Sequence, residues 1–291
     1  MSLPARRAAV LGSPIAHSLS PVLHRAAYQR LGLTGWEYQA FEVGETGLAG
    51  FLADLGPEWA GLSLTMPLKR VAAELAGVVE PVAAAVDAVN TLVRVDGGWS
   101  GANTDVPGLV NALAERGVPR VESATILGGG ATAASALAAV TEVCTGPVTA
   151  YVRTPARADQ LRATADRLGH GDRLRVEPWE LAAAGLGAGL VVATTPKGAA
   201  DALADQVPDQ PGALFDVVYD PWPTPLARAW QTGCGAVLGG LDLLVHQAVL
   251  QVELMTGLPG PLAEMRAAGQ RALAGRSGGL SPKVGRFRPF S

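Results

Sequence analysis

The chain has 291 residues, of which 48% are hydrophobic and 17% are charged, and its formal net charge is -3 at neutral pH. A chain of this length can bury a large core and favours about two domains. This net charge is too small to produce an electrostatic field that attracts nucleic acid or an anionic membrane surface. A small molecule is therefore the expected partner.

Neither the cysteines nor the apolar runs point to a secreted or membrane protein. Cys144 and Cys234 have no CxxC or Cys/His spacing, so no disulfide framework or metal site is expected, and a reducing cytoplasm fits. The first apolar run continues into Gly12-Ser13-Pro14 without a cleavage site. The uncharged stretch at residues 181–196 is interrupted by glycines and is shorter than the ~20 apolar residues of a membrane-spanning helix. We therefore expect a soluble protein, with a flexible tail at residues 276–291.

Apolar runs of strand length alternate with helical patterns, which predicts an α/β fold with two parallel sheets. In the first part, strands are expected at residues 8–11, 37–43 and 61–65. Ser20 followed by Pro21 predicts an N-cap and the start of a helix over residues 21–31. Pro67 is expected to open the helix that carries Lys69. Residues 90–95 and the turn at Asp96 predict a hairpin.

A second α/β series follows a linking helix expected at residues 106–116. Its strands are expected at residues 124–127, 148–152, 190–194 and 214–219, and amphipathic helices at residues 241–256 and 261–274 end the chain. We therefore divide the chain into residues 1–106, completed by the helices at 241–275, and residues 107–240.

The second series begins with a glycine-rich strand-to-helix junction, TILGGGATAAS. Gly128-x-Gly130-x-x-Ala133 predicts a turn in which the backbone approaches a pyrophosphate at the start of a helix. The next strand ends at Val152 and is followed by Arg153 and Thr154, with Arg157 one helical turn later. Arginines there match a 2′-phosphate, whereas an NAD site would have a carboxylate, so NADP is favoured. A tight packing turn and solvated helix-start arginines remain the alternative interpretations.

Two polar cassettes, SLTMPLK ending at Lys69 and GANTD ending at Asp105, stand out in this alanine-rich sequence. A lysine and a carboxylate brought together make a tunable proton donor. Beside a dinucleotide site, proton transfer indicates hydride chemistry on a carbonyl or an alcohol. On the residues alone, Lys69 could equally be a solvated lysine and Asp105 a helix N-cap.

Taken in order, these cassettes resemble the shikimate dehydrogenase family over residues 8–272. GSPIAHSLSP resembles the segment whose serines hold the substrate carboxylate, which implies roles for Ser18 and Ser20. LTMPLK implies substrate-binding Thr65 and catalytic Lys69. AVNT and GANTD imply substrate-binding Asn90 and, as the lysine's partner, catalytic Asp105.

The resemblance continues through the second half. It implies that the phosphates and the nicotinamide of the cofactor are bound by residues Gly128, Gly129, Gly130, Ala131, Thr132, Arg153, Thr154, Arg157, Val217 and Gly240. DVVYDPWPTPL and GLDLLVHQ further imply substrate-binding roles for Tyr219 and Gln247.

The implied activity is reversible NADPH-dependent reduction of 3-dehydroshikimate to shikimate, in aromatic amino acid and chorismate biosynthesis. The implied fold is a substrate-binding α/β domain and an NADP-binding Rossmann domain, with the C-terminal helices packed on the first. The protein would be a monomer or a homodimer.

The sequence departs from the family pattern at four positions. Ser63 and Val152 stand where asparagine is usual, and Asp242 and Leu243 stand where glycine and methionine are common. Ser63 could alter one substrate hydrogen bond, and the other departures concern the cofactor site. Three alternatives stay open: a quinate/shikimate dehydrogenase, a paralogue acting on another hydroxy acid or an aminated analogue, and a non-catalytic NADP-binding paralogue. The segments HSLSP and DPWPTP argue against a tetrahydrofolate dehydrogenase.

Overall fold

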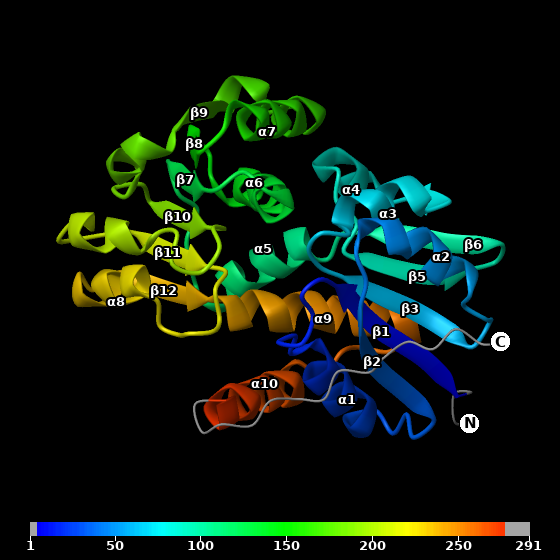
Figure 1. The fold of residues 1–291 in the computed structure, drawn as a ribbon. Coiled ribbons are helices and arrows are strands. Elements are labelled where there is room, and N and C mark those ends of the chain that lie inside the picture. Colours follow the sequence, from blue (N-terminus) through cyan, green and yellow to red (C-terminus); the bar gives the residue numbers. More distant parts are fainter. Residues whose placement is uncertain (1–4, 277–291) are drawn as a thin grey trace. The chain divides into compact units, whose positions relative to one another are not determined.

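A computed structural model describes residues 5–276, which form two compact units (Figure 1). Unit 1 runs up to Thr104 and resumes at Leu244, whereas unit 2 comprises Asp105–Leu243. The chain therefore passes from unit 1 into unit 2 and back again. Of the tail expected at residues 276–291, only Arg276 lies within the described residues, and it ends a helix.

Unit 1 is built on a six-stranded mixed sheet with the strand order β2-β1-β3-β5-β6-β4. Strand β1 pairs in parallel with β2 and β3, whereas β5 pairs antiparallel with β3 and β6. The strands are β1 Arg6–Gly12, β2 Trp36–Glu42, β3 Trp59–Leu64, β4 Val78–Val79, β5 Thr91–Val95 and β6 Gly98–Ala102. The helices before residue 105 are α1 Ser20–Arg30, η1 Glu45–Gly47, α2 Leu48–Ala53, α3 Lys69–Leu75 and α4 Pro81–Val86.

The fully buried strand β3 and its neighbours carry the core of unit 1. Phe41, Phe51 and Trp59 form an aromatic group with ring centroids 5.5 to 6.4 Å apart, in a cluster that also holds Leu62 and Leu68. Burial of such large apolar side chains is the main favourable term in folding. The cluster fixes the ends of β1 and β3, from which the polar cassettes extend.

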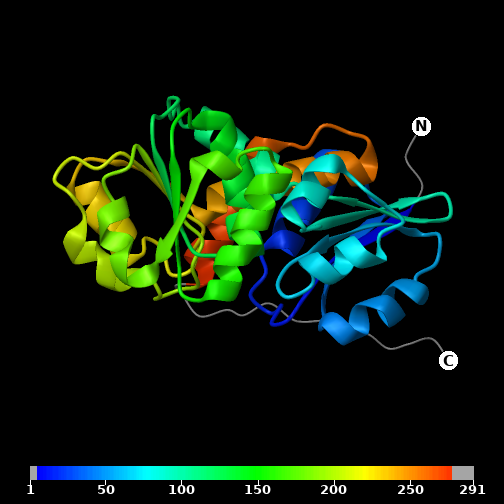
Figure 2. The same cartoon turned by 90° about the horizontal axis from the view of Figure 1, so that it is seen from above.

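The last two helices, α9 Gly240–Thr256 and α10 Leu262–Arg276, return to the first part of the chain (Figures 1 and 2). Helix α10 packs against α1. A Cβ atom at Gly61 of β3 would lie 2.6 Å from Cγ of Met255, so glycine permits the last turn of α9 to rest on the sheet. The predicted packing of the C-terminal helices on the first domain is thereby confirmed.

Unit 2 contains a six-stranded, wholly parallel sheet with the order β12-β11-β10-β7-β8-β9. This is the strand order of a Rossmann fold. The strand order reverses between β7 and β10, and such folds bind nucleotides at this topological switch point. The strands are β7 Ala124–Leu127, β8 Val148–Val152, β9 Leu174–Pro178, β10 Leu190–Ala193, β11 Ala213–Asp216 and β12 Ala236–Gly239. The helices are α5 Asp105–Glu115, α6 Ala131–Val143, α7 Pro155–Arg167, η2 Gly171–Arg173, η3 Trp179–Gly185, η4 Asp201–Gln206 and α8 Pro225–Thr232.

The predicted α/β fold is confirmed, but several local expectations are wrong. The first sheet is mixed rather than parallel. Ser20 is the first residue of α1 rather than its N-cap, because the turn begins at Leu19. Pro67 lies in the turn before α3, which begins at Lys69. Strand β11 ends at Asp216, before Tyr219.

Further differences concern short strands and the long helix. The sheet-edge strands β4, β9 and β12 were not expected, because short and partly exposed segments lack a strong apolar run. Helix α9 is buried around most of its circumference rather than amphipathic. Among residues 5–276, no helix combines the length and apolar character needed to cross a membrane.

Candidate functional site

The loops that follow β1 and β3 lie against one another in unit 1. A Cβ atom at Gly12 would clash with the Thr65 side chain, so glycine is required there. The Thr65 amide donates to the carbonyl of Leu11 at 3.0 Å, and the Ser13 amide donates to the carbonyl of Met66 at 3.0 Å. The sequence-predicted residue Thr65 is therefore held at the carboxyl end of β1, where the segment containing Ser18 begins.

The two predicted serines lie at the start of α1. Ser20 is buried as the first helical residue, and its amide donates to the Ser18 hydroxyl at 3.3 Å. The Ser18 hydroxyl therefore accepts from the first amide of the helix, although the N-cap position itself belongs to Leu19. Hydroxyl groups beside the free amides of a helix N-terminus are suited to binding an anion.

The Lys69 cassette and the GANTD cassette both attach to the segment Val89–Asn90. The Val89 amide donates to the carbonyl of Lys69 at 2.8 Å. The Thr104 amide donates to Oδ1 of Asn90 at 2.8 Å, and Nδ2 of Asn90 donates to Oγ1 of Thr104 at 3.0 Å. Asp105 follows Thr104 directly and is 7% exposed. Lys69 and Asp105 are each the first residue of a helix, α3 and α5 respectively.

Helix α9 adds Gln247 to the same group of side chains in unit 1. Gln247 is buried, and its Oε1 lies 3.5 Å from Oγ1 of Thr104. Its Nε2 donates to the carbonyl of Leu244 at 2.8 Å. Unit 1 thus brings together the predicted residues Asn90 and Gln247 through Thr104, a residue that sequence reasoning did not select although it precedes Asp105 in the cassette.

In unit 2 the glycine-rich turn has the geometry that a phosphate site requires. Gly128 has φ of 126°, which L side chains rarely adopt. A Cβ atom at Gly129 would lie 2.7 Å from Cβ of Arg157. Gly130 is the N-cap of α6 and has open space around its Cα. The turn therefore presents backbone, rather than side chains, together with the free amides of Ala131 and Thr132 at the helix start.

The predicted 2′-phosphate residues lie beside this turn. Arg153, Thr154 and Arg157 are exposed at the junction of β8 and α7, where Thr154 is the N-cap. Arg157 reaches the turn through its contact at Gly129, and its Nη1 donates to Gln160 at 3.2 Å. The junction itself carries no carboxylate. Backbone turn and arginines together can hold a phosphorylated dinucleotide.

The residues predicted to line the nicotinamide pocket also meet. A Cβ atom at Gly240 would overlap the carbonyl of Val217, and the Gly240 amide donates to the carbonyl of Val218 at 3.2 Å. Just before them, the buried Asp216 carboxylate accepts from the Thr224 hydroxyl at 2.7 Å and from the Val218 amide at 3.1 Å. Burial raises the pKa of Asp216 above its usual value. Tyr219 lies half-buried in the loop that these bonds hold.

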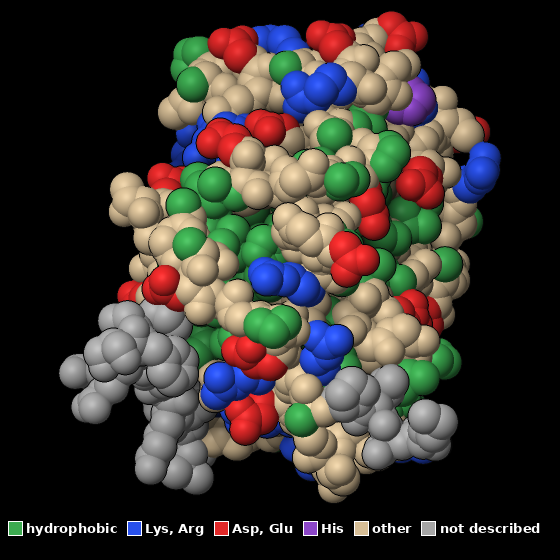
Figure 3. Space-filling model, turned by 90° about the vertical axis from the view of Figure 1, so that its right-hand side faces the viewer, with side chains coloured by type: hydrophobic (Ala, Val, Ile, Leu, Met, Phe, Trp, Pro, Cys, Tyr) green, Lys and Arg blue, Asp and Glu red, His purple; other side chains and the backbone are tan. Residues whose placement is uncertain are grey.

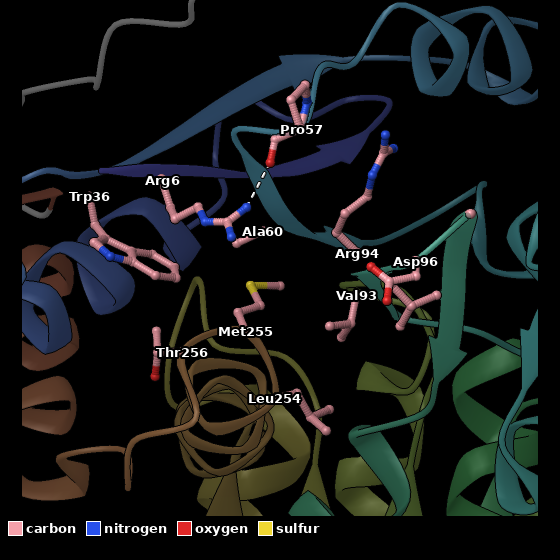
Figure 4. Close-up of a pocket in the computed structure, with 12 residues that line it drawn as sticks. Arg6, Trp36, Pro57, Ala60, Val93, Arg94, Asp96, Leu254, Met255 and Thr256 are labelled. Carbon is pink, nitrogen blue, oxygen red and sulfur yellow. Dashed lines mark hydrogen bonds between the residues drawn. The ribbon is translucent and has the colours of Figure 1, made fainter. Parts of the chain in front are cut away.

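A cavity of about 570 Å³ opens elsewhere on unit 1 (Figure 4). It is lined by Arg6, Trp36 and Ala60 near the amino ends of β1, β2 and β3, and by Met255 of α9. The predicted substrate residues follow the carboxyl ends of β1 and β3 instead, so this cavity is separate from them. On the face shown in Figure 3, charged side chains of both signs are interspersed around recessed hydrophobic ones, so that face offers no single-sign field for a polyanion.

Sequence reasoning missed two groups of buried polar residues near the predicted sites. Asp216 occurs within the segment DVVYDPWPTPL but was not selected. Tyr38 and Gln251 form hydrogen bonds to Ser63, and all three are buried. Gln251 follows Gln247 by one helical turn, so the spacing of the two glutamines was the available signal.

Comparisons of sequence with known proteins point to one enzyme family. Residues 10–92 match the family described as Shikimate dehydrogenase substrate binding domain, and residues 240–268 match Shikimate 5'-dehydrogenase C-terminal domain. The chain is 38% identical to the Shikimate dehydrogenase (NADP(+)) of Thermus thermophilus over 92% of this chain and 98% of the relative.

Solved structures resemble most of the chain. The crystal structure of Mycobacterium tuberculosis shikimate dehydrogenase is 39% identical with a TM-score of 0.83, over 91% of this chain and 99% of that one. Another similar structure is that of Thermus thermophilus shikimate 5-dehydrogenase in complex with NADP(H) and shikimate. It is 36% identical with a TM-score of 0.81, over 92% of this chain and 100% of that one.

Proposed function

The chain belongs to the shikimate dehydrogenase family, and from this premise we propose that it catalyses the reversible NADPH-dependent reduction of 3-dehydroshikimate to shikimate. This reaction belongs to aromatic amino acid biosynthesis. The observation that carries the proposal is the attachment of the Lys69 and GANTD cassettes to one buried segment, Val89–Asn90. Related enzymes whose names specify shikimate and NADP(+) support the choice of substrate and cofactor.

The substrate is a hydroxylated carboxylic acid, and the proposed binding residues suit both of its functions. Ser18 and Ser20, at the start of α1, would hold the carboxylate through hydroxyl and amide donors. Thr65, Asn90, Tyr219 and Gln247 would bind the hydroxyl groups. A site that pairs each substrate hydroxyl rejects analogues that lack one, because its own buried polar groups are then left unpaired.

Lys69 and Asp105 would perform the proton transfer. NADPH, when bound, supplies a hydride to the 3-keto carbon of the substrate. Lys69 would give a proton to the oxygen that becomes the hydroxyl, while Asp105 holds the ammonium group in place and accepts from a substrate hydroxyl. Shikimate oxidation would use the same pair in the opposite direction.

Unit 2 would bind the cofactor. The turn at Gly128, Gly129 and Gly130 leaves room for a pyrophosphate, and the amides of Ala131 and Thr132 are available as donors. Arg153 and Arg157, with Thr154, would hold the 2′-phosphate that distinguishes NADP from NAD. Val217 and Gly240 would contact the nicotinamide. We accordingly assign residues 107–240 to cofactor binding, and residues 1–106 with 241–275 to the substrate.

The direct test is an absorbance assay at the NADPH band with shikimate or quinate as substrate, each with NADP+ and with NAD+. We expect the highest kcat/KM with shikimate and NADP+. Preferential oxidation of quinate with NAD+ would support a quinate dehydrogenase instead, and absence of all turnover in a folded protein would support a non-catalytic paralogue. Either result would overturn the proposal.

Two further assignments depend on separate measurements. We propose that the protein acts in the cytoplasm, consistent with cysteines that remain free thiols at Cys144 and Cys234. The protein acts as a monomer or a homodimer, and light scattering of the purified protein would distinguish the two forms.

A further inference from the structure

A buried series of hydrogen bonds crosses the interior of unit 1. The Tyr38 hydroxyl of β2 donates to Oγ of Ser63 in β3 at 2.6 Å, and the Ser63 hydroxyl donates to Oε1 of Gln251 in α9 at 2.7 Å. Nε2 of Gln251 donates to Oγ1 of Thr91 in β5 at 3.0 Å and to the carbonyl of Asn90 at 3.3 Å. We call this series the Tyr38–Asn90 relay. Each of its side chains is buried.

The relay has one direction, which fixes the orientation of the Asn90 amide. The Thr91 hydroxyl, having accepted from Gln251, donates to Oδ1 of Asn90 at 2.8 Å. Because Thr104 also donates its amide to that oxygen, Oδ1 accepts from two protein groups. Nδ2 of Asn90 therefore lies on the other side of the amide, where it donates to Oγ1 of Thr104 at 3.0 Å and where Asn90 would also meet an oxygen of the substrate.

Within the relay, Gln251 connects side chains of the neighbouring strands β3 and β5. Ser63 and Thr91 are directly opposite one another in the antiparallel pair of β3 and β5. Both side chains are short, and the amide of Gln251 joins them by accepting from one and donating to the other. Ser63, which stands where the family often has asparagine, thus uses its hydroxyl within the protein.

The relay also reaches other residues of the proposed substrate site. At one end, the Tyr38 hydroxyl donates to Ser63, and burial raises the pKa of Tyr38, an effect that the nearby hydroxyls of Ser63 and Ser20 oppose. At the other end, Thr104 contacts both Asn90 and Gln247. Tyr38 and Asn90 come from elements far apart in the sequence, and Gln251 lies on the hydrogen-bonded path that connects them.

We propose that Gln251 is a positioning residue for substrate binding, which fixes the amide of Asn90 through Thr91 and couples it to Tyr38 through Ser63. The proposal rests on the assignment of shikimate as substrate. Gln251 itself touches no reacting atom in this scheme. Its removal leaves Thr91 free to rotate its hydroxyl and weakens the hold on Asn90, so binding of the hydroxylated substrate should suffer before binding of the cofactor.

The experiment compares Gln251→Met and Gln251→Glu with the wild type in shikimate oxidation. Gln251→Met keeps the size of the side chain but removes both hydrogen-bonding functions. We expect it to raise the KM for shikimate roughly tenfold, as loss of a buried hydrogen-bonding partner does, while the KM for NADP+ stays within about twofold.

In Gln251→Glu, the loss of the hydrogen-bond donor at position 251 should depend on pH. An ionised carboxylate at 251 can accept from Ser63 but has no proton for Thr91 or for the Asn90 carbonyl, and burial raises its pKa. The protonated acid regains one donor. We therefore expect the KM defect, expressed relative to the wild type at each pH, to shrink as the pH falls from about 9 to about 6. The defect of Gln251→Met should not depend on pH.

Val252→Ala is the matched control, because Val252 is fully buried on the same helix and takes no part in the relay. It should lower stability and leave the KM for shikimate unchanged. If Gln251 variants do not fold, Ser63→Ala interrupts the relay one step earlier and should raise the same KM.

A KM for shikimate within about twofold of wild type in Gln251→Met would overturn the inference, as would a pH-independent defect in Gln251→Glu. Inactivity of the folded wild type would overturn the proposed function itself, and this inference with it.

Discussion

At the scale of single residues, Lys69 and its neighbour Arg70 offer a direct comparison. Lys69 begins α3 and its carbonyl holds the Val89 amide, whereas Arg70 is paired with Asp87 at 3.4 Å on the surface. Both are half-buried cations on one helix. Only Lys69 is assigned to proton transfer. Replacing each residue in turn therefore distinguishes loss of the proton donor from the general effect of removing a positive charge.

We predict that Lys69→Ala lowers kcat by about 10² to 10⁴, the usual contribution of a positioned proton-transfer group. The KM for shikimate should change much less, because substrate binding uses the hydroxyl and amide side chains. Steady-state kinetics in both directions, with circular dichroism to verify folding, provide the measurement. Arg70→Ala should keep kcat within about twofold. A folded Lys69→Ala protein with normal kcat would show that the proton comes from elsewhere.

Arg153 should determine the choice of cofactor. It is exposed immediately after β8, at the junction where a carboxylate would select NAD. We predict that Arg153→Ala reduces kcat/KM for NADP+ roughly tenfold while kcat/KM for NAD+ changes little, since the lost charge-assisted bonds involve only the 2′-phosphate. Arg162, which pairs with Asp159 on the same helix at 3.2 Å, is the control. Equal losses with both cofactors would contradict the 2′-phosphate role.

At the scale of secondary-structure elements, α1 packs a neutral histidine into an aromatic cluster. The ring of His24 stacks on Tyr38 with centroids 3.9 Å apart, and its Nδ1 donates to the carbonyl of Ser20 at 3.0 Å. Full burial lowers the pKa of His24 from 6.5 to about 4, against the smaller opposite effect of the Ser20 carbonyl. Tyr28, the other ring beside it, has a pKa raised by burial.

This histidine should make the fold sensitive to acid. Because its folded pKa lies below its unfolded value, the unfolded chain binds the extra proton between pH 6.5 and about 4. Stability from neutral His24 is complete above pH 6.5 and is lost as the pH falls to about 4, by a total of about 3 kcal/mol. Urea unfolding at pH 7, 5.5 and 4 measures this loss. His24→Phe keeps a buried ring and should remove that part of the pH dependence, and an unchanged dependence would count against it.

The boundaries of elements were harder to predict from sequence than the elements themselves. Strand β7 and strand β8 begin and end where the apolar runs do, because a central parallel strand is buried on both faces. Ser20 was misplaced by one position, since the N-cap of α1 is Leu19. Pro67 was misplaced because its turn contacts the loop after β1, where the Ser13 amide donates to the carbonyl of Met66. Tertiary contacts of this kind leave no local pattern.

At the scale of the whole molecule, the fold could be predicted from the order of the apolar runs, whereas the buried hydrogen bonds of the relay could not. Alternation of strands and helices is a local property, and right-handed crossovers then limit the topology. The bond between Ser63 and Gln251 joins residues 188 positions apart. No spacing rule connects them, so the relay became visible only in three dimensions. The cassettes around Lys69 and Asp105 could be found beforehand because their polar residues are adjacent in sequence.

The division into two units predicts how fragments of the chain should behave. Residues 105–243 hold their own hydrophobic cluster around Leu127, Leu214 and Trp230, together with every proposed NADP contact. Unit 1, by contrast, needs its C-terminal segment, because α10 packs on α1 and Met255 rests on Gly61. An independently packed core is what allows a domain to fold alone.

We therefore predict that a fragment of residues 105–243 folds and binds NADP+, and that Arg153→Ala weakens this binding. A chain ending at residue 243 should keep unit 2 but lose the folded structure of unit 1, and should not oxidise shikimate. Far-UV circular dichroism, thermal unfolding and calorimetric titration with NADP+ would test both fragments. A cooperative unfolding transition in the first fragment that NADP+ moves to higher temperature would support independent folding, because a ligand that binds only the folded state stabilises it. An unfolded 105–243 fragment, or a shikimate-oxidising chain without α9 and α10, would mean that the two units do not fold as separate bodies.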